Sequence, residues 1–270
     1  DAAIDDGEYL ELVNISDTIL ETADLSISRI KINEYDTSWY TAPLSGQLLF
    51  PKDYIAYAQS KTQVERVYYS EAPENIISLN SFPSLPNDEG IVLLHLSSSK
   101  DSIIDRLDYS EDWHYSLLNT TKGVSLEKMN LYGGNTQENW HSAASSVNYG
   151  TPAYENSQFQ KEGETSSSFE TYPEVFSPDN DGFDDLLQIN YQMKEAGYTL
   201  NLLIYDSRGR IIKHLVENEL LATSGSFYWD GQDENYQKAN MGIYILFFEY
   251  FDLNGNVKSE KLTCVLGGKL

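Results

Sequence analysis

Cysteine is almost absent from this chain of 270 residues, which contains a single one, Cys264. One thiol forms neither an internal disulfide nor a zinc site built from several cysteines of the same chain. The fold therefore has to be held together by a hydrophobic core. With 40% apolar and 13% aromatic residues, the composition supports one large domain or two small ones with packed cores.

Basic residues are also scarce. The chain has 18 Lys and Arg against 42 Asp and Glu, which gives a formal net charge of −24. Both halves are acidic, with 9 basic and 24 acidic residues in 1–156 and 9 basic and 18 acidic residues in 157–270. Proteins that bind nucleic acid present a basic surface to the phosphates. The composition therefore disfavours nucleic acid as a partner.

Long apolar runs are missing as well. The longest ones, at 91–96 and 243–248, are far shorter than the roughly 20 residues of a membrane helix. The N-terminus shows no secretory signal pattern. These features predict no direct membrane insertion, and the acidic start without a methionine suggests a mature or excised piece of a longer protein.

The apolar residues that are present alternate with polar ones, which is the pattern of β-strands. In 187–194, for example, Leu187, Ile189 and Tyr191 alternate with polar neighbours. Gly209 and Gly255 end short acidic turns of the kind that join hairpin strands. The sequence predicts an all-β fold, with one helical turn or irregular loop within 61–80. Strand candidates in the first half are 8–13, 25–32, 54–58, 91–96, 102–109 and 123–129.

One stretch, 157–171, has no alternation and is rich in Ser, Glu and Gln. It is interpreted as a short polar linker between two domains, 1–156 and 172–270. Each domain has a suitable size for a β-sandwich. We find no repeat of 20–50 residues that would indicate a solenoid or a propeller.

The first half resembles the bacterial lamin-tail domain. The carrying motifs are EYLELVN at 8–14, LPNDEG at 85–90, GVSLE at 123–127, NWHSAA at 139–144, GTP at 150–152 and YEN at 154–156. The resemblance implies an immunoglobulin-like β-sandwich that acts as a non-catalytic interaction module. The family normally has one more strand before EYLELVN, for which 1–7 leaves little room. We therefore expect an open sheet edge, filled from upstream polypeptide or by strand addition from a partner.

The second half resembles C-terminal immunoglobulin-like modules related to the flagellar hook-capping protein and to the gliding-motility, type IX secretion sorting domains. The motifs are FSPDNDGFDD at 176–185, LIYDSRGRII at 203–212, YWDG at 228–231 and GIY at 242–244. The resemblance implies either a sorting signal for export or a rigid immunoglobulin-like spacer. The motifs do not separate these two roles.

The densest group of candidate metal ligands lies in the loop 179–185. Asp179, Asp181, Asp184 and Asp185 offer four carboxylates within seven residues, the hard oxygen ligands that calcium prefers. Their spacing is not that of an EF-hand. The alternative is a turn stabilised by Asp and Asn side chains, in which Gly182 provides the bend. Calcium, in a structural role, is the cofactor that the sequence suggests.

A cluster of aromatic residues, Tyr35, Trp39 and Tyr40, is a candidate partner or ligand surface. It is expected in a loop, beside Asn33 and Asp36. Aromatic platforms of this kind bind sugars and proteins. The alternative is that these rings pack against neighbouring loops.

No catalytic arrangement is found, since the chain has no nucleophile elbow, metalloprotease helix motif or phosphate-binding loop. Trp113-His114 and Trp140-His141 allow a two-histidine metal site or a general base, but structural roles are favoured. Cys264 is interpreted as a buried strand residue.

The sequence therefore predicts a non-enzymatic C-terminal part of an exported bacterial protein at the cell surface, associated with the outer membrane. Its role would be docking or assembly with envelope proteins, and its second half would serve in sorting. Two alternatives stay open. One is a carbohydrate-binding module, and the other is an accessory region of a secreted enzyme whose catalytic domain lies upstream.

Overall fold

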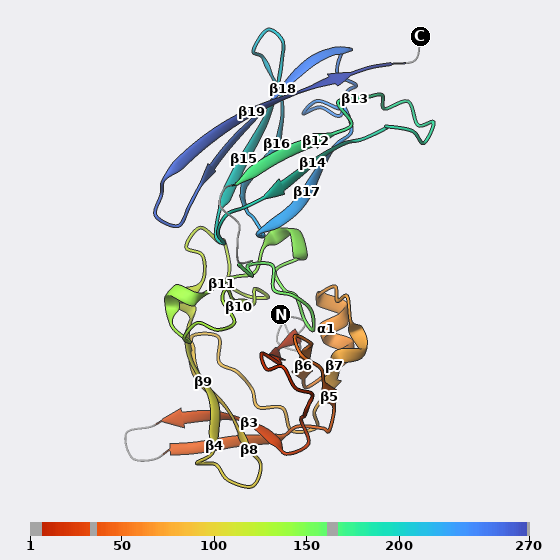
Figure 1. The fold of residues 1–270 in the computed structure, drawn as a ribbon. Helices are drawn as coiled ribbons and strands as arrows, with labels where there is room; N and C mark the ends of the chain where they lie inside the picture. Colours follow the sequence, from red (N-terminus) through yellow and green to blue (C-terminus); the bar gives the residue numbers. More distant parts are fainter. Residues whose placement is uncertain (1–6, 33–36, 161–166, 269–270) are drawn as a thin grey trace. The chain divides into compact units, whose positions relative to one another are not determined.

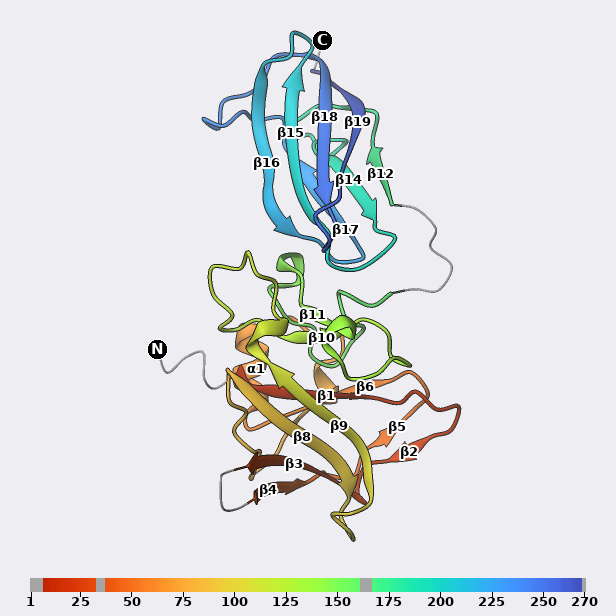
Figure 2. The same ribbon diagram turned by 90° about the vertical axis from the view of Figure 1, so that its left-hand side faces the viewer.

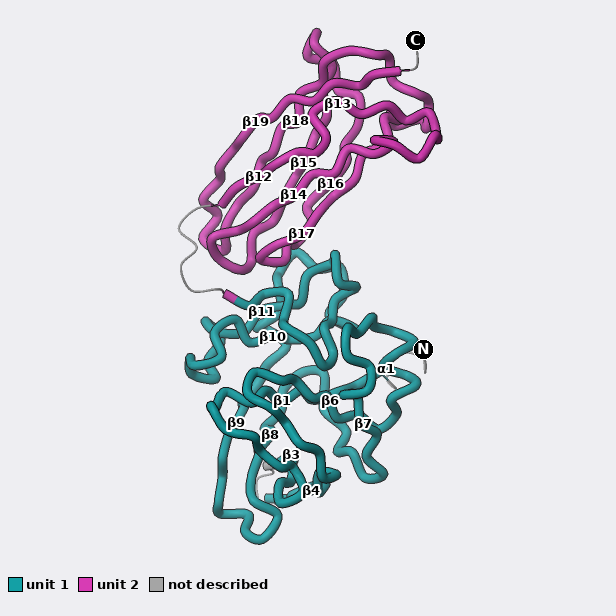
Figure 3. The backbone as a smooth tube through the Cα atoms, turned by 45° about the vertical axis from the view of Figure 1, so that its right-hand side comes forward, with its two compact units in different colours: residues 1–159 teal, residues 160–270 magenta. Residues whose placement is uncertain are grey.

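The computed structural model describes residues 7–32, 37–160 and 167–268 and is built almost entirely of β-strands. It divides into two compact units, residues 1–159 (unit 1) and 160–270 (unit 2) (Figure 3). The predicted all-β class is confirmed. Among the described residues, no helix has both the length and the apolar character needed to span a membrane.

The described residues of unit 1 form eleven short strands in four sheets. A four-stranded antiparallel sheet has the order β4-β3-β8-β9, and a second sheet has the order β1-β6-β7 (Figures 1 and 2). Two strand pairs, β2-β5 and β10-β11, complete the unit. The strands are β1 (Tyr9–Val13), β2 (Leu20–Glu21), β3 (Leu25–Ile32), β4 (Thr37–Pro43), β5 (Leu48–Leu49), β6 (Tyr54–Ala58), β7 (Ile76–Ser78), β8 (Glu89–Leu96), β9 (Ile103–Ser110), β10 (Leu126–Lys128) and β11 (Trp140–Ser142).

Alternation along β3 determines the two faces of the four-stranded sheet. Ile27 and its cross-strand neighbours Ala42 and Leu94 face the core between the sheets. On the opposite face, Ser28 is buried and its hydroxyl lies 2.8 Å from Nε2 of buried His95. On this face, Ser28 and His95 are therefore hydrogen-bonded to each other instead of being exposed to solvent.

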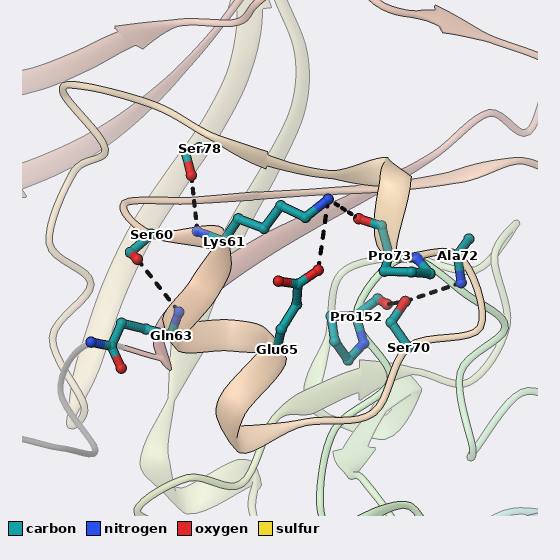
Figure 4. A network of polar contacts seen from close by, with 9 residues as sticks. All are labelled: Ser60, Lys61, Gln63, Glu65, Ser70, Ala72, Pro73, Ser78 and Pro152. Atoms are coloured by element: carbon teal, nitrogen blue, oxygen red, sulfur yellow. Dashed lines mark hydrogen bonds and ion pairs between the residues drawn. The ribbon is translucent and has the colours of Figure 1, made fainter.

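The helical turn expected within 61–80 is α1 (Lys61–Val67). Ser60 caps it, because its hydroxyl accepts a hydrogen bond from the backbone N–H of Gln63 at 3.4 Å (Figure 4). Lys61 pairs with Glu65 one turn later at 3.7 Å, and Val64 is buried. The remaining helices among the described residues of unit 1 are single 3₁₀ turns, at η2 (Pro73–Asn75), η3 (Glu111–Trp113), η4 (Gln137–Asn139) and η5 (Ser145–Val147).

Unit 2 is a sandwich of two sheets, visible face to face in Figure 1. One sheet has the order β12-β14-β17, and the other has the order β13-β19-β18-β15-β16. The strands are β12 (Ser168–Tyr172), β13 (Val175–Phe176), β14 (Leu187–Gln192), β15 (Thr199–Asp206), β16 (Ile211–Leu220), β17 (Ser224–Trp229), β18 (Gly242–Phe251) and β19 (Val257–Leu266).

The core of unit 2 is formed by the residues that alternate with polar ones along its strands. Leu187, Ile189 and Tyr191 of β14 are buried, while the residues between them are half-buried. β18 is apolar on almost every residue and lies in the middle of the larger sheet. Trp229 is completely buried and packs between the rings of Phe176 and Tyr244, with ring centroids 5.3 and 5.0 Å away.

The predicted linker, 157–171, extends too far. Residues 168–171 belong to β12, where Phe169 is buried against Phe248 at a centroid distance of 4.2 Å. Polar residues on the solvent side of this edge strand conceal the strand in the sequence, since only Phe169 has a strongly apolar side chain within 167–171.

Candidate functional site

The acidic loop of unit 2 is organised around the carboxylate of Asp185. This carboxylate accepts hydrogen bonds from the backbone N–H groups of Asp179 at 3.1 Å, Asn180 at 2.7 Å and Gly182 at 2.8 Å. Gly182 has a φ of 87°, a left-handed conformation that glycine adopts without strain. A turn stabilised by Asp side chains is therefore present, in which Asn180 takes part through its backbone N–H.

Three of the four predicted calcium ligands also come together. Asp179, Asp181 and Asp185 each bring a carboxylate oxygen to within 4.8 Å of the others. Asp184 does not join this cluster. It lines a hollow of about 320 Å³ beside the loop, together with Tyr172 and Tyr228. Three carboxylates fit part of the six to eight oxygens that calcium takes, although both oxygens of Asp185 already accept backbone hydrogen bonds.

The aromatic cluster does not form one platform. Trp39 and Tyr40 lie in β4 rather than in the expected loop, and successive strand residues point to opposite faces of the sheet. Trp39 packs edge-on against His95 at 6.1 Å, whereas Tyr40 stacks under the guanidinium of Arg29 at 5.3 Å. Tyr35 lies outside the described residues. The prediction of a loop was wrong for Trp39 and Tyr40. Each face of the edge strand β4 carries one aromatic residue next to polar ones, so the sequence shows no strand with one apolar and one polar face.

The histidines and the cysteine take structural positions. His114 Nδ1 lies 2.9 Å from the hydroxyl of Ser142, and His141 Nδ1 lies 3.1 Å from the Ser142 carbonyl. Burial lowers the pKa of both imidazoles. Cys264 is buried in β19, and its removal from water raises the pKa of the thiol to about 12. This thiol is therefore a poor nucleophile at neutral pH.

A cavity with a volume of about 900 Å³ runs along β1 in unit 1. Its lining includes every residue of β1, and Val92, Leu94 and Leu107 of β8 and β9 contribute an apolar wall. Residues 123–128 and Trp140 form a further wall. The sequence indicated an open sheet edge at this strand but gave no indication of the enclosing walls, which come from distant segments.

Two carboxylates to which the sequence did not point lie at this cavity, and Glu127 is buried whereas Glu11 is half-buried. Glu11 accepts a hydrogen bond from the N–H of Ala153 at 2.6 Å, and Glu127 accepts from the hydroxyl of Ser157 at 2.7 Å and the N–H of Gln158 at 3.0 Å. Removal from water raises the pKa of both, and the nearby charge of Glu127 raises that of Glu11 further. The feature of the sequence that could have indicated a carboxylate at this site is Glu11, which lies between two leucines in EYLELV.

The YWDG motif of unit 2 closes one end of the sandwich. Trp229 donates its indole N–H to the carbonyl of Gln232 at 2.9 Å, and Asp230 accepts from the N–H of the same residue at 3.0 Å. Gly231 has a φ of 74° between them, and a side chain there would collide with Leu266 at 2.8 Å. The motif is thus explained by packing around a buried indole.

These features define unit 2 as an immunoglobulin-like β-sandwich whose sequence motifs serve its core and turns. In agreement, residues 170–265 match the family model CHU_C Type IX secretion signal domain. The match lies within unit 2 and covers most of it. A type IX secretion signal domain implies a secreted protein that is directed to the cell surface. No significantly similar curated protein is found.

Solved structures with some similarity include two proteins of Porphyromonas gingivalis. One is PorZ, a component of the type IX secretion system, with 16% identity over 66% of this chain and a TM-score of 0.29. The other is dimeric latent PorU, with 9% identity over 97% and a TM-score of 0.28. This chain spans 21% and 18% of their lengths.

A third structure, CopC from Methylosinus trichosporium OB3b, shares 14% identity over 32% of this chain and 78% of its own length, with a TM-score of 0.21. At TM-scores this low, the three likenesses carry no functional inference.

Proposed function

We propose that unit 2 is the signal by which a non-catalytic surface protein is exported through a type IX secretion system. The observation that carries this proposal is the match of residues 170–265 to the secretion signal family. The sandwich of unit 2, with one continuous core, supports it, because the matched residues lie in one compact folded unit.

Unit 1 would then be the part that docks to other proteins of the envelope at the outer membrane. Its resemblance to the lamin-tail domain supports an interaction role, and we retain that family as a prediction for residues 8–156. The carbohydrate-binding alternative is weakened, since Trp39 and Tyr40 lie on opposite faces of β4. The accessory role beside an upstream catalytic domain stays a prediction.

The test is an export assay in a bacterium that has a type IX secretion system. A luciferase carrying an N-terminal signal peptide is fused in front of residues 1–270, and surface and medium activity are compared with the periplasmic fraction. We expect export in the parent strain and retention in the periplasm of a strain whose type IX translocon is inactivated. Equal export in both strains would contradict the proposal.

A matched control is the same fusion ending at residue 159, where unit 1 ends. This fusion should be retained in the parent strain. If it reached the surface as efficiently as the full-length fusion, the signal would not lie in unit 2.

A further inference from the structure

β1 offers one edge of its backbone without a strand beside it. Among the described residues, β1 pairs only with β6, in antiparallel register from Tyr9 opposite Ala58 to Val13 opposite Tyr54. The backbone N–H of Asn14 bonds to the Asp53 carbonyl at 3.1 Å, in line with this ladder.

Because the N–H of Asn14 points toward the partner strand, this hydrogen bond shows which backbone groups of β1 point toward β6 and which point away from it. In an antiparallel ladder every second residue turns its N–H and C=O toward the partner strand. Leu10 and Leu12 therefore face β6, and Tyr9, Glu11 and Val13 face the open side. Within the described part of the chain, the backbone groups of these three residues form no hydrogen bond.

The cavity of about 900 Å³ is lined by every residue of β1 and by residues of β8, β9 and β10, strands that do not pair with β1. The cavity continues along the chain from Gly7 to Ser16, beyond both ends of β1. A strand of five residues has a length of about 17 Å, so an added strand of that length would match β1 from end to end. The apolar wall formed by Val92, Leu94 and Leu107 would receive every second side chain of such a strand.

The charge of the lining indicates the chemistry of the occupant. Two lysines, Lys122 and Lys128, are present among the lining residues. Four carboxylates, at Glu8, Glu21, Asp105 and Glu111, outnumber them without Glu11 and Glu127, whose raised pKa favours the uncharged form. An occupant that carries lysine or arginine at its polar positions would complement this lining, whereas an acidic one would be repelled.

β1 lacks several of the features that keep sheet edges from pairing. Its register with β6 is continuous, without a bulge, and its sequence, YLELV, contains no proline or lysine. Its one charged residue is Glu11, whose raised pKa reduces the cost of burying it in an uncharged form. The edge is therefore suited to pair with another strand.

We propose that this cavity is a strand-acceptor site, in which an extended segment of a partner protein pairs with the free edge of β1. The segment alternates apolar residues with lysine or arginine. Its backbone satisfies the outward groups of Tyr9, Glu11 and Val13, and its apolar side chains occupy the cavity. This site does not depend on the secretion role of unit 2.

The experiment uses the full chain and a synthetic peptide of about nine residues that alternates valine with lysine. Binding is followed by NMR, with amide hydrogen exchange measured for each residue of β1. We expect saturable binding that slows exchange at Tyr9, Glu11 and Val13. A control peptide with the same composition, in which valines and lysines form separate blocks, should bind at least about tenfold more weakly, since only charge attraction remains.

Two variants test whether the backbone edge is the contact. Val13→Pro removes an outward N–H and leaves the ladder to β6 intact, and we expect about a tenfold loss of affinity. Val13→Thr keeps the N–H and should bind within about twofold of the wild type. If Val13→Pro unfolds unit 1, the exchange result on the unaltered chain still decides.

Several results would overturn the proposal. They are no binding of the alternating peptide, equal binding of the block peptide, or binding that leaves amide hydrogen exchange at Tyr9, Glu11 and Val13 fast. Protection of these amides that rises with protein concentration in the absence of peptide would show that a second copy fills the site. Slow exchange in the dilute free chain would show that the edge is already covered.

Discussion

β1 in unit 1 and β16 in unit 2 are both edge strands, yet they differ in how they are protected. β16 has ten residues, its pairing with β15 is interrupted by register shifts, and it carries Lys213, Glu217 and Glu219. β1 has five residues in continuous register beside a cavity. Bulges and charges on an edge oppose further pairing, so of these two strands only β1 is suited to accept another.

The hydrophobic cores of the two units also differ, in the number and the size of the residues that they bury. Among the described residues, unit 2 has one cluster of 19 buried residues, which includes Trp229, Phe176 and Phe248. The described part of unit 1 has two separate clusters of 8 and 6, and four of those residues are alanines. Because burial of large apolar side chains is the main stabilising contribution to folding, unit 2 should be the more stable. The following predictions probe this contrast, beginning with the largest effect.

Trp229→Ala should destabilise unit 2 by about 3–5 kcal/mol, since it removes a completely buried indole. Calorimetry of the full chain should show the transition of unit 2 at a much lower temperature and that of unit 1 unchanged. The matched control is Tyr228→Ala on the same strand, where the ring is 55% exposed. A change as large for Tyr228 as for Trp229 would contradict the described core.

Glu11→Gln should stabilise unit 1 at neutral pH by on the order of 1 kcal/mol and have little effect near pH 4. The folded state raises the pKa of Glu11 well above its ordinary 4.5. The folded protein therefore holds this proton to higher pH than the unfolded chain does, and stability is lost as pH rises from about 4.5 through the folded pKa. Urea denaturation of the wild type and the variant between pH 4 and 8 measures this loss of stability.

The control for this prediction is Glu89→Gln on β8, an exposed carboxylate that reports the general effect of removing one negative charge. If both variants changed the pH dependence equally, burial of Glu11 would not be its cause.

Asp185→Ala should lower the stability of unit 2 by about 1–2 kcal/mol, because three backbone N–H groups lose their acceptor. Asp184→Asn is the control, since it removes a carboxylate outside the cluster and keeps a side chain that tolerates the φ of 52° at this position. Thermal denaturation of both variants compares them. Equal destabilisation would argue against the central role of Asp185.

The smallest effect concerns calcium. If Asp179, Asp181 and Asp185 hold a calcium ion, millimolar calcium should raise the Tm of unit 2 relative to a chelator, because a ligand of the folded state stabilises it. Asp181→Asn should abolish the increase, and magnesium serves as the ion control. A Tm that is the same with calcium and chelator would contradict the calcium proposal and leave the loop as a turn.

Much of this fold could be predicted from strand periodicity. β3 and β6 were predicted at their observed bounds, and the central position of β18 agrees with its apolar residues on both faces. The missed strands, such as β4 and β12, are edges with few apolar residues. A strand that buries only part of one face leaves a weak alternation in the sequence.

The sites were less predictable, because they depend on which distant segments meet. Asp179, Asp181 and Asp185 are close in sequence and come together as predicted, whereas Asp184, with a φ of 52°, lies outside the cluster and lines the hollow beside the loop. The burial of Glu11 depends on Ala153, which lies 142 residues away. The cavity beside β1 likewise has walls from several distant parts of unit 1.

The contrast between the two units is tested most directly by residue-resolved amide exchange in the free, dilute chain. We predict slow exchange along β18, slow exchange at Leu10 and Leu12 of β1, and fast exchange at Tyr9, Glu11 and Val13. Uniformly slow exchange along β1, at the level of β18, would contradict the account of an open edge in unit 1.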